Sequence, residues 1–307
     1  MLTLFLVKTA RALLTVLMCV TVVFVVLRLS GDPAETLLPE NTPPDTVAEY
    51  RARWGLDAPL PEQYLRYLAA VLHGDFGRSF ADNRDALSVV MERVPATLLL
   101  GGATFAVALL LGVPLGMVAA LRRNSATDRA VMSFAVFSFS TPHFFLGILL
   151  ILLFTMQLRW LPSSGSGSWQ HMVMPVVTLG TASAGTLARV TRTAMLEVMG
   201  QPFLRTARGK GASESYAVRR HALPNAAIPV VTVIGFQLGG LIGGALVTET
   251  VFAWPGVGRL LVSAVSGRDL AVVQTIVLLV AATMVTANYL VDIAYGLLDP
   301  RIRSGRQ

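Results

Sequence analysis

Long apolar stretches that contain no Asp, Glu, Lys or Arg dominate the chain. Four of them lie at 94–121, 130–158, 221–248 and 270–291. Each is longer than the roughly 20 apolar residues that a helix needs to cross the hydrocarbon core of a bilayer. The hydrophobic pattern therefore predicts at least four transmembrane helices.

Two further stretches predict additional crossings. Residues 12–27 are apolar and extend over the apolar start of the chain at 2–7, while 172–198 carries Arg189, Arg192 and Glu197 in its last third. Long charged side chains near the end of a span can reach the headgroups, so these charges are compatible with a crossing. The alternative for the start, a cleaved secretory signal, needs a small-residue cleavage site that 29–32 does not offer. The sequence thus predicts an all-α integral membrane protein with six transmembrane helices.

The charged residues indicate the orientation of these helices. Only 14% of the 307 residues are charged, against roughly 25% in soluble domains. Segment 30–93 holds eleven acidic residues and six arginines, whereas the segments on the other side of the membrane carry the basic excess, including Arg122, Arg205, Lys210 and Arg301. Because basic loops stay in the cytoplasm, we expect both termini to be cytoplasmic and 30–93 to be external. The net charge of +7 then reflects topology and needs no nucleic-acid partner.

The expected organisation has three parts. They are the cytoplasmic start and first transmembrane helix (1–29), an external domain (30–93), and a five-helix core (94–307) with a cytoplasmic loop at 199–225. Within the core, the helices are expected at 94–121, 130–156, 172–198, 226–250 and 271–297. No internal repeat relates the two halves, which disfavours a secondary transporter built from inverted repeats.

Motifs for catalysis, nucleotide binding and metal binding are missing from the sequence. Gly209-Lys210-Gly211 lacks the glycine spacing and the hydroxyl residue of a phosphate-binding loop. The four histidines show no metal-binding spacing, and Cys19 is the only cysteine. Only Asp292 is expected to be a buried intramembrane charge, and an ion pair explains it better than a proton relay. We expect no enzyme activity, no metal and no cofactor in this chain.

Glycines recur every four residues in the fifth predicted span. Gly235, Gly239 and Gly243 form one series, and Gly240 and Gly244 form a second. Such spacing leaves one helix face nearly without side chains and permits close backbone approach. The pattern is equally compatible with helix packing and with a helix that lines a pathway.

A basic segment between the fourth and fifth predicted spans could contact a partner. Pro202 suits the first turn of a helix, and the basic residues that follow alternate with the small Ala207, Gly211 and Ala212. A short surface helix with small residues could enter a groove on another protein. Periodicity alone favours this interpretation no more than a solvated loop.

Three separated motifs resemble one family of proteins. Residues 205–212 (RTARGKGA), followed by 221–225 (HALPN), resemble the cytoplasmic "EAA" loop of ATP-binding-cassette importer permeases. The stretches 54–64 and 72–79 look like the amino-terminal region of the first permease subunit of dipeptide, oligopeptide and nickel importers, and 249–258, 268–269 and 291–301 are similar to the same branch. One departure is that Arg205-Thr206-Ala207 stands where the wider family has Glu-Ala-Ala.

This resemblance implies a function and a set of partners. The chain would pair with a second, related permease, two cytoplasmic subunits would bind ATP and magnesium, and an external binding protein would deliver substrate. A coupling helix would dock on an ATPase through Phe203, Leu204, Arg205, Thr206, Ala207, Arg208, Gly209, Lys210, Gly211 and Ala212. The expected cargo is dipeptides or oligopeptides. Import of nickel or a nickel chelate is the alternative within the family, and a secondary transporter is a more distant one.

Overall fold

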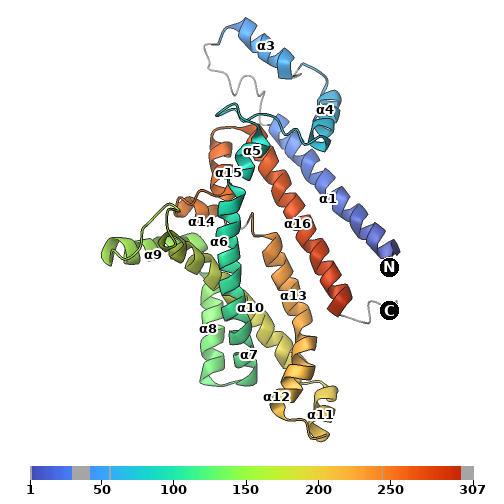
Figure 1. The fold of residues 1–307 in the computed structure, drawn as a ribbon, viewed down its shortest axis with the longest axis vertical. Helices are drawn as coiled ribbons and strands as arrows, with labels where there is room; N and C mark the ends of the chain where they lie inside the picture. The colour runs from blue at the N-terminus through green and yellow to red at the C-terminus, as the bar shows by residue number, and fades with distance from the viewer. Residues whose placement is uncertain (1, 30–41, 55–56, 244, 299–307) are drawn as a thin grey trace.

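The computed structural model describes residues 2–29, 42–54, 57–243 and 245–298. Over these residues the chain is helical, with turns and one isolated β-bridge between Arg78 and Asp85. Figure 1 shows an elongated arrangement in which α10 (Gln170–Met199) lies at the centre. The all-helical architecture predicted from the hydrophobic pattern is confirmed for this part of the chain.

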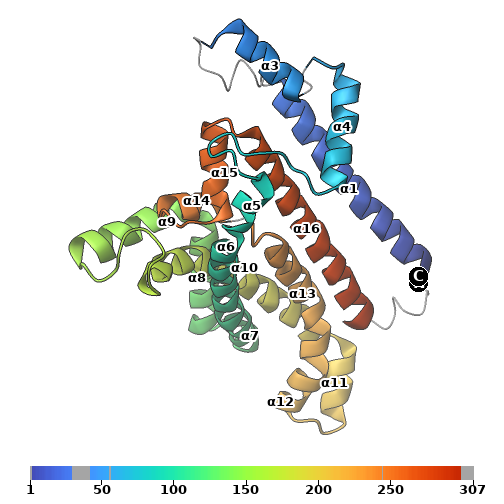
Figure 2. The ribbon, with the colours of Figure 1, turned by 45° about the horizontal axis from the view of Figure 1, so that its top comes forward.

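Five helical segments in the described residues are long and apolar enough to cross a membrane, or six if a bent pair counts as one span. They are α1 (Leu2–Leu29); α5 (Ala86–Met91) with α6 (Val94–Val107), η1 (Ala108–Gly112) and α7 (Val113–Leu121); α10; α12 (Glu214–Ala217) with η3 (Val218–Ala222) and α13 (Leu223–Gly239); and α16 (Leu270–Leu298). In Figures 1 and 2, α1 and α16 run side by side along one flank of the molecule. The first, second, fourth and sixth predicted spans coincide with these helices.

Prolines explain the two wide π-helical turns within the second and fourth of these segments. The turn η1 ends at Gly112, two residues before Pro114, and η3 ends at Ala222, two residues before Pro224. A proline has no N–H to donate, and its ring collides with the carbonyl four residues earlier, so the helix widens locally to remove the clash. Each helix therefore continues across its proline.

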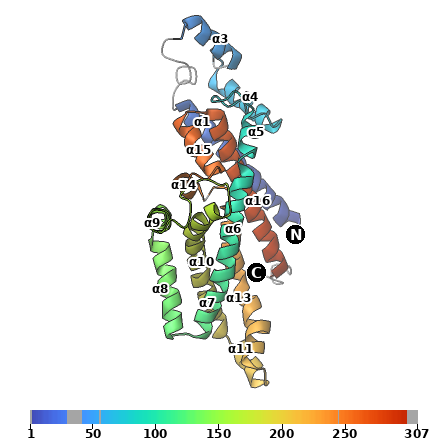
Figure 3. The same cartoon turned by 60° about the vertical axis from the view of Figure 1, so that its left-hand side comes forward.

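The third predicted span, 130–156, is not a single straight helix. The chain forms α8 (Ala126–Ser140), then α9 (His143–Leu150) and η2 (Ile151–Gln157), and the two halves meet at an angle of 100°. Pro142 at the break disfavours a helical Thr141, whose backbone is extended. As a result, α9 lies across the direction of α8 (Figure 3). The hydropathy of this stretch stays high across the break, so the hydrophobic pattern did not predict it.

The fifth predicted span, 226–250, is also displaced. The helix begins at Glu214 and ends at Gly239, and a turn separates it from α14 (Leu246–Val251). Glycine has low helix propensity, and Gly239, Gly240 and Gly243 are concentrated at this point. The prediction of one glycine face on a continuous helix is therefore wrong at Gly243, which lies beyond the end of α13. Gly244 lies outside the described residues.

Small residues on α10 allow its neighbours to pack closely. A methyl group added at Gly112 would come within 2.7 Å of the carbonyl oxygen of Ala184, and one added at Gly116 would collide with the carbonyl of Ala188. Close approach through small residues is a usual means of helix association in membranes. Besides α7, the helices α8 and α13 also contact α10.

The region between the first two spans contains α3 (Pro44–Trp54) and α4 (Leu60–Leu72). The hydroxyls of Thr21 and Tyr64 share a hydrogen bond of 2.6 Å, and Phe24 contacts the rings of Tyr64 and Tyr67. These contacts hold α4 against α1, so that α3 and α4 lie at the end of the molecule opposite α11 (Pro202–Gly209) (Figure 1). The first part of the predicted external domain, 30–41, lies outside the described residues.

Candidate functional site

The basic segment predicted to contact a partner contains a short helix, α11, at one end of the molecule (Figures 1 and 2). Pro202 occupies its first turn, and Leu204 is only 1% exposed. Leu204 belongs to a buried cluster with Met195, Ala217 and Ala222. This single apolar anchor fixes α11 to the ends of α10 and α13 and leaves the remainder of the helix at the surface.

The helix is shorter than the predicted 203–212. It ends at Gly209, and Gly211 adopts a φ of +88°. The N–H of Ala212 donates to the carbonyl of Ala207, and the N–H of Gly211 donates to that of Arg208. This pair of bonds is the usual glycine-terminated end of a helix. Gly211 is thus required for the turn, and it does not lie on the helix as a small contact residue.

A bidentate ion pair joins α11 to α12. Arg208 donates from Nε and from a terminal guanidinium nitrogen to the two carboxylate oxygens of Glu214, at 2.8 and 2.7 Å. Together with Leu204 it gives the loop two attachments, one apolar and one polar. The loop is therefore a defined projection with a fixed position.

The predicted coupling residues divide by exposure. Leu204 is buried, and Ala207, Arg208 and Ala212 are half-buried. The exposed members are Phe203, Arg205, Thr206, Gly209, Lys210 and Gly211. The exposed surface of α11 and of the turn after it therefore carries one aromatic ring, Phe203, and two cations, Arg205 and Lys210.

The glycines of the fifth span face α16. A methyl group added at Gly235 would collide with Val291. One added at Gly239 would lie 3.2 Å from the side chain of Ala287, and one added at Gly243 would lie 3.1 Å from the side chain of Val280. Gly240 caps the C-terminus of α13 and lines a small cavity that is also lined by residues of α6 and α10. The contacts of Gly235, Gly239 and Gly243 are of the kind made in helix packing, and Gly235 also lines a cavity between α13 and α16.

A buried carboxylate that the sequence placed at a span boundary proves to be a structural centre. Glu249 is completely buried and accepts hydrogen bonds from the hydroxyl of Thr97 at 2.7 Å and from the N–H of Arg259 at 3.1 Å. The Thr97 oxygen in turn accepts from the N–H of Val257 at 2.7 Å. Burial raises the pKa of Glu249, while the bonds from Thr97 and from the backbone of Arg259 and Gly258 oppose this shift. The network attaches α6 to α14 and to the start of α15 (Val257–Ser266).

A second carboxylate attaches the loop before α5 to the start of α16. Asp269 is 4% exposed and accepts from the hydroxyl of Ser79 at 2.5 Å and from the N–H of Phe80 at 3.0 Å. Its other oxygen accepts from the N–H of Val272 in the first turn of α16. Asp269 thus joins segments that are 190 residues apart in sequence.

A third polar contact joins α8 to α10. Arg192 donates from Nε and a terminal nitrogen to both carboxylate oxygens of Asp128, at 2.5 and 2.7 Å. Asp128 also accepts from the N–H of Asn124 at 2.9 Å. The side chain of Asp128 is 4% exposed, whereas that of Arg192 is 22% exposed.

None of these three contacts could be predicted from the sequence, because hydropathy and charge bias cannot reveal a partner far away in the chain. Glycines offered one signal for Glu249. A side chain at Gly256 or Gly258 would crowd the carboxylate of Glu249. Glycines seven and nine residues after a glutamate are therefore compatible with a backbone that packs closely around that carboxylate.

Comparisons with known proteins agree with this architecture. The model of a family described as "Binding-protein-dependent transport system inner membrane component" matches residues 112–304, and the model of its N-terminal region matches 1–101. Among solved structures, an inward-facing methionine ABC transporter, MetNI, aligns with a TM-score of 0.58 and 21% identity, covering 69% of this chain and 96% of that one. An amino acid ABC transporter aligns with a TM-score of 0.52 and 20% identity, covering 67% and 92%. At these identities the solved structures share the fold.

Curated relatives match nearly the whole chain. The glutathione transport system permease protein GsiC of Salmonella paratyphi A (strain ATCC 9150 / SARB42) is 42% identical over 290 residues, which cover 94% of this chain and 95% of that protein. GsiC of Escherichia coli (strain K12) is 42% identical over 275 residues, or 90% of each chain. The chain belongs to the family of binding-protein-dependent transport system inner membrane components, in the peptide and nickel branch of ATP-binding-cassette importer permeases.

Proposed function

We propose that this chain is one of two permease subunits of an ATP-driven importer of short peptides of about the size of glutathione. The observation that carries the proposal is the 42% identity, over 94% of this chain, to a protein named for glutathione transport. Glutathione is itself a modified tripeptide, so this relationship agrees with the peptide cargo expected from the sequence motifs.

The proposal divides the work between subunits. A second permease would complete the pathway, two cytoplasmic subunits would bind ATP and magnesium, and a binding protein outside the membrane would deliver the peptide. In this scheme α11 is the coupling helix that docks on an ATPase. Its attachments support this role, because Leu204 and the Arg208–Glu214 pair would make the helix move with α10 and α13 as one body.

Uptake in cells tests the cargo. A strain that lacks this permease but keeps the other subunits should lose uptake of radiolabelled glutathione and of trialanine, and a plasmid copy should restore both. Uptake of nickel, free or chelated, measured in the same strains, tests the alternative within the family. Loss of nickel uptake with unchanged peptide uptake would show that the cargo is nickel and not a peptide.

A substitution on α11 tests coupling. Gly209 is exposed, and an added side chain there would meet open space, so Gly209→Arg should fold normally and obstruct docking. Gly211 is unsuitable because its positive φ would strain any other residue. We expect the Gly209→Arg transporter to lose stimulation of ATP hydrolysis by peptide-loaded binding protein.

The matched control is Ala52→Arg, which adds the same charge on exposed α3 at the opposite end of the molecule. This variant should keep full stimulation. Normal stimulation in Gly209→Arg as well would remove α11 from the coupling role.

Labelling tests the proposed orientation. Ser213 caps α12 through its hydroxyl, so the exposed Ser215 is the better site for a cysteine, in a Cys19→Ser background. A membrane-impermeant maleimide should label Ser215→Cys only after the cells are opened. Labelling in intact cells would place the loop outside and contradict the scheme.

A further inference from the structure

A small hollow lies between α6, α10 and the turn that follows α13. Its volume is about 200 Å³. Three polar side chains line it, Thr104 from α6, Ser183 from α10 and Gln237 from the last turn of α13. Apolar or small residues complete the wall, namely Gly101, Phe105, Leu179, Gly240, Leu241 and Ala245.

The hydroxyl of Thr104 is buried and has no hydrogen-bond partner among the residues that the structure describes. The side chain is only 8% exposed. Threonines in apolar helices usually donate to a carbonyl one turn earlier, as Thr178, Thr275 and Thr283 do here at 2.7–2.8 Å. A buried polar group without a partner is costly, so the hydroxyl of Thr104 would be stabilised by a hydrogen bond to a polar group placed against it.

Gln237 adds both a donor and an acceptor. Its Nε2 donates to the carbonyl oxygen of Ser183 at 3.4 Å, near the limit for a hydrogen bond. The side-chain amide carries two N–H donors and one carbonyl acceptor, which matches the N–H and C=O of a peptide group. With the hydroxyls of Thr104 and Ser183, the hollow has neutral partners for one such group.

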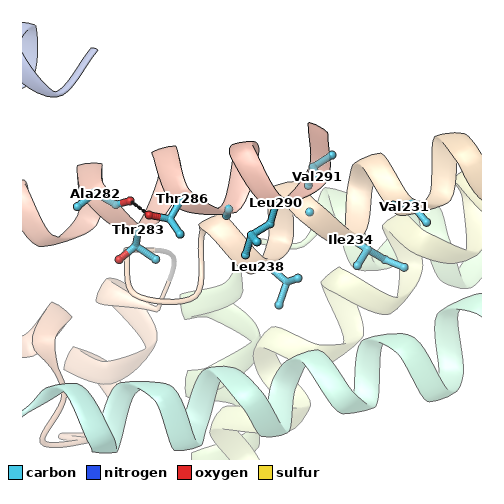
Figure 4. A pocket seen from close by; sticks show the side chains of 10 residues that line it. Val231, Ile234, Leu238, Ala282, Thr283, Thr286, Leu290 and Val291 are labelled. Atoms are coloured by element: carbon cyan, nitrogen blue, oxygen red, sulfur yellow. Dashed lines mark hydrogen bonds between the residues drawn. The ribbon is translucent and has the colours of Figure 1, made fainter. Parts of the chain in front are cut away.

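A second, larger cavity provides the contrast. It measures about 570 Å³ and lies between α13 and α16, where Val231, Ile234, Leu238 and Leu290 face it (Figure 4). Its two threonines use their hydroxyls within their own helix, Thr283 on Leu279 and Thr286 on Ala282, the latter drawn as a dashed line in Figure 4. The walls of both cavities are mostly apolar, but the small hollow is lined by a threonine whose hydroxyl has no partner among the described residues, whereas both threonines of the larger cavity are satisfied.

We propose that Thr104, Ser183 and Gln237 form a subsite that hydrogen-bonds the main-chain amide of a peptide in transit. This inference rests on the proposed function. No ionisable side chain lines the hollow among the residues that the structure describes, so it favours a neutral peptide group over an ammonium or a carboxylate. Its volume is below the roughly 300–1,000 Å³ of a complete ligand pocket, so it holds one part of the peptide. Neutral hydrogen bonds are weak enough to let the cargo leave, as transport requires.

The test compares an amide with an ester in the complete transporter reconstituted in liposomes. The probes are glutathione and its analogue in which an ester oxygen replaces the glycine nitrogen. We expect Gln237→Leu to lower kcat/KM for glutathione about five- to tenfold, and that for the ester, which lacks the N–H, by about twofold or less. Thr104→Val should lower glutathione transport about fivefold, with unchanged assembly of the complex.

Thr191→Val is the matched control. Thr191 is also buried, and its hydroxyl also has no partner among the described residues, but it does not line the hollow. This variant should transport both probes like the wild type. Equal losses for glutathione and ester in Gln237→Leu, or no loss in either, would overturn the subsite. A wild-type transporter that moves neither probe would overturn the proposed function and the subsite with it.

Discussion

The hydroxyl of Thr97 donates a hydrogen bond of 2.7 Å to the fully buried carboxylate of Glu249. The two residues are 152 positions apart in sequence. Because the same Thr97 oxygen accepts from the N–H of Val257, one side chain satisfies two buried groups and holds α6 against α14 and α15. A buried carboxylate needs such partners, because a carboxylate without hydrogen bonds costs far more free energy in the protein interior than at the surface, where water can bind it.

Thr97→Val should destabilise the transporter by about 1–3 kcal/mol, because it removes a bond to Glu249 and leaves the N–H of Val257 without its acceptor. The measurement is the thermal midpoint of the purified transporter in detergent. Thr250→Val serves as control, because Thr250 is exposed and bonds only within its own helix. Equal midpoints for Thr97→Val and the wild type would show that the network contributes nothing.

The stability of the wild type should depend on pH through Glu249. Burial raises the pKa of this carboxyl above its ordinary value of 4.5 in the folded protein. Its stabilising contribution is then fully present below about pH 4.5 and is lost as the pH rises through the raised value. Thermal midpoints measured from about pH 4 to pH 8 should fall more steeply for the wild type than for Glu249→Gln. Parallel curves for the two proteins would refute this dependence.

The ion pair between Asp128 and Arg192 should behave as a buried pair. Arg192→Met leaves the carboxylate of Asp128, which is 4% exposed, without its cation, and should cost about 3 kcal/mol. Adding Asp128→Asn to the Arg192→Met variant should recover part of that loss, because it removes the unpaired charge. A matched surface pair is Arg66 with Glu62, whose side chains are 63% and 50% exposed, and Glu62→Gln should cost less than about 1 kcal/mol. Similar losses at the two pairs would contradict the difference in burial.

Asp269→Ala should release the loop before α5 from α16. The N–H of Phe80 then loses its acceptor, so its amide should exchange with deuterium faster, as measured by mass spectrometry on peptides that cover 76–85. Asp75→Ala is the control, since Asp75 is exposed in the same loop and bonds only to the N–H of Gly77. Unchanged exchange at Phe80 in Asp269→Ala would show that other contacts hold the loop.

The helical architecture and the place of α11 could be predicted from the sequence because they depend on local properties. Apolar stretches of sufficient length form transmembrane helices, and Pro202 at the head of a basic segment begins a surface helix. The breaks were missed where hydropathy stays uniform. Pro142 turns the third span by 100°, and the glycines after Leu238 end the fifth, although both stretches are as apolar as an unbroken helix.

Hydropathy, charge bias and short motifs in the sequence by themselves determined the membrane class, the expected orientation and the family of this protein, because each is a property of consecutive residues. Only the tertiary structure decided which charges are buried and what each polar group contacts. Glu249 bonds to Thr97, Asp269 bonds to Ser79, and Thr104 and Gln237 line the same hollow. Those pairs lie more than 130 residues apart in the chain, so the energy of each depends on how the helices pack, which no local pattern encodes.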